Sequence, residues 1–221
     1  MITRALGLAL LGLAVSCQPE LPKPVNLSEV TRAYRSREYK RVLDRWTRSG
    51  RITKSFDMVL DASATFKSWD FRQAYIARFV EAYKISGRER DTMSDRELAD
   101  ARQTYEVFFS AATSKYEWTD FSEKNSIWRI KLIDDKQREV RPVEIRRVKD
   151  PHAHLETFFP YVQMFSKQYL IRFPETVDGQ PLLGPDTKYF VLRFAGPLGT
   201  LDLRWSTEGS GEAPVNVPDE D

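Results

Sequence analysis

The chain has 221 residues, 41% of them apolar and 30% charged, with 34 basic and 32 acidic side chains. This composition excludes a collagen-like chain, a disordered chain and a polytopic membrane protein. The formal net charge of +2 lacks the basic excess of nucleic-acid binding proteins, so we expect no nucleic-acid partner. The length favours a core that needs no disulfide, and the single cysteine, Cys17, has no intramolecular partner.

The first sixteen residues have the pattern of an export signal. One charged residue, Arg4, precedes an unbroken run of apolar and small residues over 5–15. As a helix this run spans roughly 16 Å, about half of the ~30 Å core of a bilayer. The segment is therefore too short for a durable transmembrane anchor and is typical of a cleaved signal peptide.

Residues 13–17, Leu-Ala-Val-Ser-Cys, resemble the lipobox of bacterial lipoproteins. In that family the cysteine sulfur takes a diacylglycerol, a dedicated signal peptidase cuts before the cysteine, and the new amine is often acylated. The resemblance implies that residues 1–16 are removed and that palmitate-class chains on Cys17 hold the protein in membrane lipid of a bacterial cell envelope. Ala14 replaces the commoner leucine, and the alternative is a plain secretory signal in which Cys17 has no role. Gln18 resembles the class sorted to the outer membrane, with the body facing the periplasm or the cell surface.

Both termini outside the signal lack the pattern of a packed core. Residues 17–26 hold three prolines and are predicted to be a lipidated N-terminus followed by an extended tether. Residues 206–221 hold five acidic and no basic side chains and are predicted to be a disordered acidic tail. The globular domain is expected over 27–205, with a helix-rich half (27–118) and a β-rich half (119–205).

In the helix-rich half, Ser28 is placed to cap a helix that runs to the Ser49-Gly50 pair. Basic residues are in excess over 28–54, so this helix either contacts anionic lipid headgroups or has an ordinary solvated face. Apolar and polar residues alternate over 52–66, which predicts one long strand of an antiparallel sheet, bent or bulged.

In the segment 69–83 the spacing of apolar residues changes to that of a helix. A stripe of aromatic side chains recurs at four-residue steps, formed by Phe71, Tyr75, Phe79 and Tyr83. The stripe either packs on the sheet or lines a groove for a ligand. Gly87 is expected to end this helix, and a capping box that begins at Ser94 predicts a short second helix before a strand at 107–112.

From Trp118 onward every element is predicted to be a strand. These strands are expected at 128–132, 140–148, 169–173, 189–194 and 201–205. Asp134 and Asp135 are interpreted as turn residues, Pro142 indicates an edge position, and the turn over 196–199 predicts a hairpin. The whole pattern predicts an α+β fold that is mainly β. We expect an antiparallel sheet, sandwich-like with an immunoglobulin-like arrangement or a half-barrel, with two to three helices in the N-terminal half.

The sequence offers few candidates for a reactive site. His152 and His154, the only histidines, are expected in a loop with both rings on one side, and are weak candidates for a metal site, for a pH-sensitive contact or for no special role. There is no Gly-x-Ser-x-Gly elbow, Walker-type loop or Gly-x-Gly-x-x-Gly loop. We therefore expect no cofactor and no catalytic residue, the alternative being a hydrolase with an unrecognised site.

An aromatic connection follows the histidines. Phe158, Phe159 and Tyr161 either form a patch for a partner or fold back to plug the end of the core. The leading hypothesis is a membrane-anchored envelope lipoprotein with a non-enzymatic interaction or structural role and an envelope protein as its partner. The alternative is a carrier of lipid or another hydrophobic ligand, with an apolar groove under the 69–83 helix.

Overall fold

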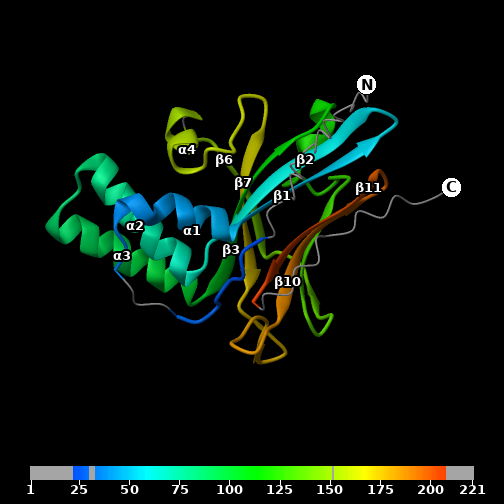
Figure 1. The fold of residues 1–221 in the computed structure, drawn as a ribbon. Helices are drawn as coiled ribbons and strands as arrows, with labels where there is room; N and C mark the ends of the chain where they lie inside the picture. The colour runs from blue at the N-terminus through cyan, green and yellow to red at the C-terminus, as the bar shows by residue number, and fades with distance from the viewer. Residues whose placement is uncertain (1–21, 30–32, 151, 208–221) are drawn as a thin grey trace, which may run out of the picture.

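The computed structural model describes residues 22–29, 33–150 and 152–207. Residues 13–17, with the lipobox-like pattern, and all but the first two residues of the predicted acidic tail lie outside the described residues. The described chain forms an α+β fold dominated by antiparallel sheets, as predicted, with its longer helices gathered on one side (Figure 1). None of the helices in the described part is long and apolar enough to cross a membrane.

The larger sheet has five strands, each antiparallel to its neighbours. Their order is β1 (Thr47–Lys54), β2 (Asp57–Phe66), β3 (Thr104–Ala112), β7 (Lys167–Pro174) and β6 (Glu144–Val148). Strand β3 is buried on both faces, because the second sheet covers one side and the helices with the chain after α4 cover the other. This sheet takes strands from both predicted halves of the chain, so the two halves form one structure.

The second sheet has four antiparallel strands. Their order is β11 (Gly199–Ser206), β10 (Tyr189–Gly196), β4 (Arg129–Asp134) and β5 (Glu139–Val140). A further ribbon pairs β8 (Thr176–Val177) with β9 (Gln180–Pro181). Aromatic rings join the two main sheets: Phe66 lies 4.8 Å from Phe190 and Phe109 lies 5.3 Å from Phe194, centroid to centroid. The hairpin predicted at 196–199 connects β10 to β11, and β10 is central in its sheet, as expected.

The long strand predicted over 52–66 is wrong: the segment contains parts of two strands. Strands β1 and β2 form a hairpin whose turn residues Ser55 and Phe56 have φ angles of 48° and 70°. Positive φ at both central residues is the mark of a type I′ turn, which normally carries Asn and Gly. Because the turn has two residues, the alternation of apolar and polar residues continues unbroken from one strand to the next. The turn is therefore not visible in the sequence pattern.

The first predicted helix is also corrected. It does not begin at Ser28, whose backbone N–H donates to the Asn26 side chain (2.9 Å) in a local turn. A 3-10 turn, η1 (Ser36–Glu38), leads into α1 (Tyr39–Trp46), and the next residues already belong to β1.

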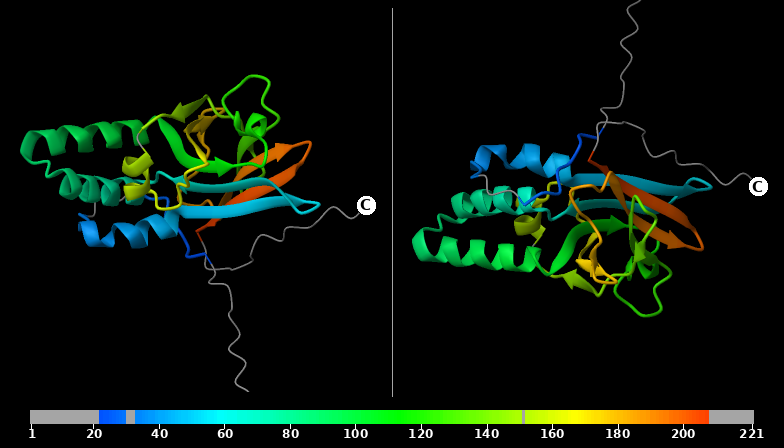
Figure 2. Two further views of the ribbon diagram at one scale, coloured as in Figure 1. Left: turned by 90° about the horizontal axis from the view of Figure 1, so that it is seen from above. Right: turned by 90° about the horizontal axis from the view of Figure 1, so that it is seen from below.

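Helix α2 (Trp69–Tyr83) lies where the aromatic period placed it. Its cap is Ser68, whose hydroxyl accepts the Phe71 N–H (3.0 Å). Helix α3 (Gly87–Ala101) begins well before the predicted Ser94. Gly87 is the first residue of this helix and not, as predicted, the end of the preceding one. The two helices form an antiparallel pair that projects beyond the ends of the strands (Figure 2).

The C-terminal half departs from the prediction at three places. The predicted loop with the histidines is α4 (His152–Phe158), and a 3-10 turn, η2 (Tyr116–Thr119), precedes β4. The single strand predicted over 140–148 is divided at Pro142, because β5 ends in the four-stranded sheet and β6 begins in the five-stranded one. Both are edge strands, in agreement with the position of the proline.

Candidate functional site

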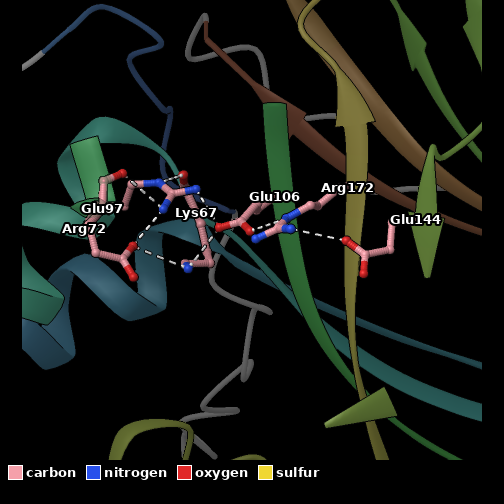
Figure 3. Close-up of polar contacts among 6 residues, drawn as sticks. All are labelled: Lys67, Arg72, Glu97, Glu106, Glu144 and Arg172. Atoms are coloured by element: carbon pink, nitrogen blue, oxygen red, sulfur yellow. Dashed lines mark hydrogen bonds and ion pairs between the residues drawn. The ribbon is translucent and has the colours of Figure 1, made fainter. Parts of the chain in front are cut away.

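A cluster of charged side chains lies at the junction of α2, α3 and the larger sheet (Figure 3). Its centre is Glu106 on β3, which is 1% exposed. The Glu106 carboxylate accepts hydrogen bonds from Lys67 Nζ (2.9 Å), Arg72 Nη2 (2.6 Å) and Arg172 Nε (2.7 Å). Three cations on one buried carboxylate satisfy the rule that buried charges are paired.

Arg72 is the second buried member of this cluster, with no exposed surface. It projects from the first turn of α2, where the Ser68 cap sets the start of the helix. Its Nε donates to the Lys67 carbonyl (3.0 Å) and its Nη1 to the Glu97 carboxylate (2.6 Å). Because Glu97 belongs to α3, this one guanidinium ties both helices to the Glu106 carboxylate on the sheet.

Burial and charge act in opposite directions on Glu106. Burial alone would raise its pKa, but the charges of Lys67 and Arg72, together with hydrogen bonds from Lys67 and Arg172, lower the pKa to about 2. The carboxylate is therefore ionised at every physiological pH. A proton-transferring group needs a pKa near the working pH, so Glu106 is suited to holding the helices and not to acid–base chemistry.

The cluster extends across the sheet as a ladder of alternating charges. Glu106, Arg172 and Glu144 are direct cross-strand neighbours on β3, β7 and β6. Arg172 Nη1 donates to Glu144 (3.1 Å), and its hydrogen bond to Glu106 is the main cause of its raised pKa. The ladder brings the charge network from the buried junction to the edge of the sheet.

A second buried carboxylate, Asp70, connects α1 to the start of α2. It is 5% exposed and accepts hydrogen bonds from Trp46 Nε1 (2.9 Å), Arg45 Nη1 (3.3 Å) and the Tyr34 hydroxyl. Its position in the first turn of α2 is also favourable for a negative charge, because the helix dipole is positive there. These contacts hold α1 against α2.

The predicted aromatic stripe runs from the core to the surface. Phe71 is fully buried, Tyr75 and Phe79 are half-buried, and Tyr83 is 50% exposed. Burial, with smaller effects from Glu97, Asp150 and Tyr83, raises the pKa of the Tyr75 hydroxyl. The first turn of the stripe therefore packs on the sheet, as one of the two interpretations expected, and its last turns face outward.

The connection after α4 packs against this stripe. Phe158 and Phe159 are buried, with the Phe158 ring 5.3 Å from Tyr75 and the Phe159 ring 4.0 Å from Phe108. Tyr161 shares a hydrogen bond with the Thr65 hydroxyl (2.7 Å), and burial raises its pKa. These aromatic side chains close the core beneath α2.

The two histidines do not form a shared site. On a helix, residues two apart point to different sides: His154 contacts the Tyr83 hydroxyl and the Phe158 ring, whereas His152 Nδ1 lies 3.5 Å from Glu156. No group of three metal-ligating side chains occurs in the part of the chain that the structure describes. The expectation that both rings point to one side is therefore wrong, because the segment is helical and not extended.

A groove of about 830 Å³ lies between the α2–α3 pair and strands β3, β6 and β7. Tyr75 and Phe79 contribute aromatic surface, and Arg88, Arg96 and Arg146 contribute basic side chains. The guanidinium groups of these three arginines form no hydrogen bond or ion pair with any other described residue. The groove therefore offers cationic groups that are available to a ligand, beside a cluster whose charges are already paired.

Tyr75 and Phe79, the aromatic wall of this groove, belong to the stripe predicted from the sequence, whereas the charged members of the groove have no such signal. Lys67, Arg72 and Arg172 belong to no motif, and Glu97 is predicted only as part of a capping box. The charged partners of all four are distant in the sequence. One signal was present: Glu106 is an acidic residue at the start of the apolar strand 107–112, and an acid in a strand buried on both faces requires a basic partner.

No protein-family model matches the chain, and no curated protein matches it in sequence. Among solved structures, the chain is similar to a protein of unknown function from Burkholderia pseudomallei. The two sequences are 11% identical, the match covers 81% of this chain and 94% of that one, and the TM-score is 0.42.

Proposed function

We propose that this chain is a bacterial envelope lipoprotein that binds a protein partner through the groove between α2, α3 and β6, and that its role is non-enzymatic. The proposal of a lipid anchor rests on the position of Cys17. This residue, the single cysteine, follows the apolar run of an export signal. Acyl chains contribute about 0.8 kcal/mol per buried methylene, so several chains on one cysteine hold a protein at a membrane.

The composition of the groove supports the binding role. Protein interfaces are enriched in aromatic side chains, methionine and arginine, and the groove is lined by Tyr75, Phe79, Met93, Arg88 and Arg96. The ionised Glu106 cluster beneath it supplies a rigid floor, because every member is held by at least one charged partner.

The carrier hypothesis receives less support from the geometry. The space directly under α2, lined by apolar residues such as Phe71 and Phe158 and by charged residues such as Lys67, has a volume of about 160 Å³. Ligand sites usually enclose about 300–1,000 Å³. A carrier for an acyl chain needs a larger apolar cavity than this one.

Mass spectrometry of the mature protein from a Gram-negative host tests the anchor. We expect an N-terminus at Cys17 with a diacylglycerol on sulfur, membrane partition of the wild type, and release of Cys17→Ser from the membrane. Ser16→Ala is the matched control and keeps the modification, since it leaves the thiol in place and keeps a small residue before it. An unmodified chain that begins at another residue refutes the lipoprotein assignment.

Site-specific crosslinking in intact cells tests the groove. A photoreactive amino acid at Phe79 should crosslink an envelope protein, and Arg96→Glu should weaken that crosslink at least several-fold by reversing a groove charge. Arg90→Glu is the control on the same helix, because Arg90 is outside the groove and already pairs with Asp91 (2.9 Å). Equal crosslinking in both variants contradicts binding at this groove.

A further inference from the structure

A second pocket lies between the start of α1, helix α2 and the chain after α4. Its volume is about 590 Å³, and four of its lining side chains are basic whereas one, Glu81, is acidic. The basic side chains are those of Arg35, Arg37, Lys40 and Arg78. They come from the chain at η1, from the first turn of α1 and from the second half of α2. We call this site the basic pocket.

The described part of the chain balances few of these positive charges. Arg35 and Arg37 form no ion pair with any described residue, and the Arg78 guanidinium donates to the Ser36 hydroxyl (3.4 Å). Lys40 bonds to Asp44 (2.8 Å), but both side chains are largely exposed, and such surface pairs contribute little net energy. The basic pocket therefore has an excess of positive charge that is available to an anionic group.

The floor of the basic pocket is fixed by buried contacts. Tyr39 and Leu43 are 5% and 3% exposed, and the Tyr39 hydroxyl donates to the Phe158 carbonyl (2.6 Å). Asp70, at the start of α2, accepts a hydrogen bond from Trp46 Nε1 at the end of α1 (2.9 Å). The backbones that carry the four basic side chains are consequently held at a fixed spacing.

The chain beyond β11 has the opposite charge. Residues 208–221 contain five acidic and no basic side chains, and three of the acids are consecutive, at Asp219, Glu220 and Asp221. The groove between α2 and α3 is less suitable for such a segment, because four acidic side chains line it beside five basic ones. Charge complementarity therefore favours the basic pocket as the place where this segment binds.

The end of β11 lies close enough to the basic pocket for these acids to reach it. Trp205 Nε1 donates to the Trp46 carbonyl at the end of α1 (2.9 Å), and Figure 2 shows β11 ending beside α1. Because η1 and α1 together rise roughly 18 Å, the path from the end of β11 to Arg35 is roughly 30 Å. Residues 208–219 can span roughly 40 Å, which allows a curved path.

We propose that the acidic segment 208–221 binds in the basic pocket of its own chain, where Asp219, Glu220 and Asp221 pair with the basic side chains. This inference depends neither on the proposed anchor nor on the groove between α2 and α3. Exposed ion pairs are individually weak, but a tethered segment has an effective concentration of about a millimolar, so a few of them hold it. The bound segment competes with any external anion for the same basic side chains.

Zero-length crosslinking of the full chain tests this contact. A carbodiimide joins a carboxylate to a lysine amine when the two groups touch, and peptide mass spectrometry identifies the joined residues. We expect Lys40 to be joined to segment 208–221 several-fold more often than Lys124. Lys124 is the matched control, because it is exposed and precedes β4 at the far end of the β10–β11 hairpin. That end is roughly 25 Å from Ser206, within reach of the same segment.

Two surface variants separate binding from chance contact. Arg37→Glu should lower the yield at Lys40 several-fold, since it reverses an unpaired charge in the basic pocket. Arg141→Glu makes the same change of charge at an exposed position outside the pocket and should leave the yield unchanged. Salt at about 1 M, which shortens the Debye length to about 3 Å, should remove the excess yield at Lys40.

Three results overturn the proposal. A yield at Lys40 no higher than at Lys124 shows that the segment is not bound. A yield at Lys40 that is the same in Arg37→Glu as in the wild type shows that the charge of the basic pocket does not hold the segment. In a mixture of isotope-labelled and unlabelled chains, joined peptides that combine both labels show that the segment binds a second copy instead of its own chain.

Discussion

At the scale of single residues, the stability of the helical side of the molecule depends on pairs of buried charges. Arg72 and Glu106 are 0% and 1% exposed and lie 2.6 Å apart. Loss of one partner of such a pair typically costs about 3–5 kcal/mol, because the other charge stays buried without compensation. Arg72 and Glu106 therefore control whether α2 and α3 stay on the sheet.

Glu106→Gln is expected to remove part of the acid sensitivity of folding. The folded protein lowers the pKa of Glu106 from 4.5 to about 2, so its contribution is complete above pH 4.5 and is lost as the pH falls toward 2. That shift corresponds to about 3 kcal/mol of unfolding free energy. Urea unfolding at several pH values between 7 and 2 measures it.

In that series the variant is expected to be less stable than the wild type at pH 7 and to lose less stability on acidification. Glu123→Gln, at an exposed position, is the control and should retain the wild-type acid dependence. An unchanged acid dependence in Glu106→Gln would mean that the carboxylate is not the group responsible.

The sequence allowed the stripe residues to be predicted but not the charged pairs. Phe71 and Tyr75 follow the period of one helix, so their common face can be predicted from local spacing alone. Arg72 lies on the same helix, yet its buried state depends on Glu106, which reaches it only through the pairing of β2 with β3. Contacts of this kind are decided by tertiary structure, and local periodicity carries no information about them.

At the scale of elements, the β10–β11 hairpin is held by a close approach of backbone to backbone. A Cβ at Gly196 would lie 2.8 Å from the Ile127 carbonyl oxygen and 3.1 Å from the Trp128 ring. The carbonyl cannot move away cheaply, because Trp128 is buried directly before β4. The glycine thus lets the segment before β4 pack on the end of β10.

Gly196→Ala is accordingly expected to destabilise the protein by about 1–3 kcal/mol, the usual cost of overpacking. Thermal and urea unfolding measure the change. Gly184→Ala is the matched control, since a Cβ there meets no atom within 4 Å. If both alanine variants unfold like the wild type, the approach of Ile127 is looser than the structure indicates.

Elements can be predicted well where a periodic pattern repeats over many residues. They are predicted poorly where the end of an element lacks the turn or capping residue that is typical there. Helix α2 was found with its correct ends, but the β1–β2 turn was not, because Ser55 and Phe56 lack the Asn-Gly signature. The sequence favours Gly87 as the end of a helix, whereas it is the first residue of α3. Helix α4 was missed because its seven residues are too few to establish a 3.6-residue period.

At the scale of the whole molecule, the N-terminal segment is part of the folded body and not only a tether. Val25 lies within the predicted tether, yet it is 4% exposed and bonded to the last strand. The folded part consequently begins a few residues before the predicted boundary at residue 27, and the segment joins the start of the body to its end.

Val25→Ala is expected to lower the unfolding free energy by about 1–2 kcal/mol, since two methyl groups leave the core. Val143→Ala, at a position 65% exposed, is the control and should change it by less than about 0.5 kcal/mol. Urea unfolding of both variants checks the difference, and an equal effect at the two positions would show that Val25 is not held against the body.

The division of the strand at Pro142 has a consequence for the order in which the protein folds. Strand β3 cannot be covered until β7 has been made, more than fifty residues later, and β6, whose neighbour in the sheet is β7, cannot pair before then. Pairings so distant along the chain give a high contact order and slow folding. A chain that stays unfolded while it is being synthesised remains competent to pass through a secretion channel, as the proposed route to the envelope requires.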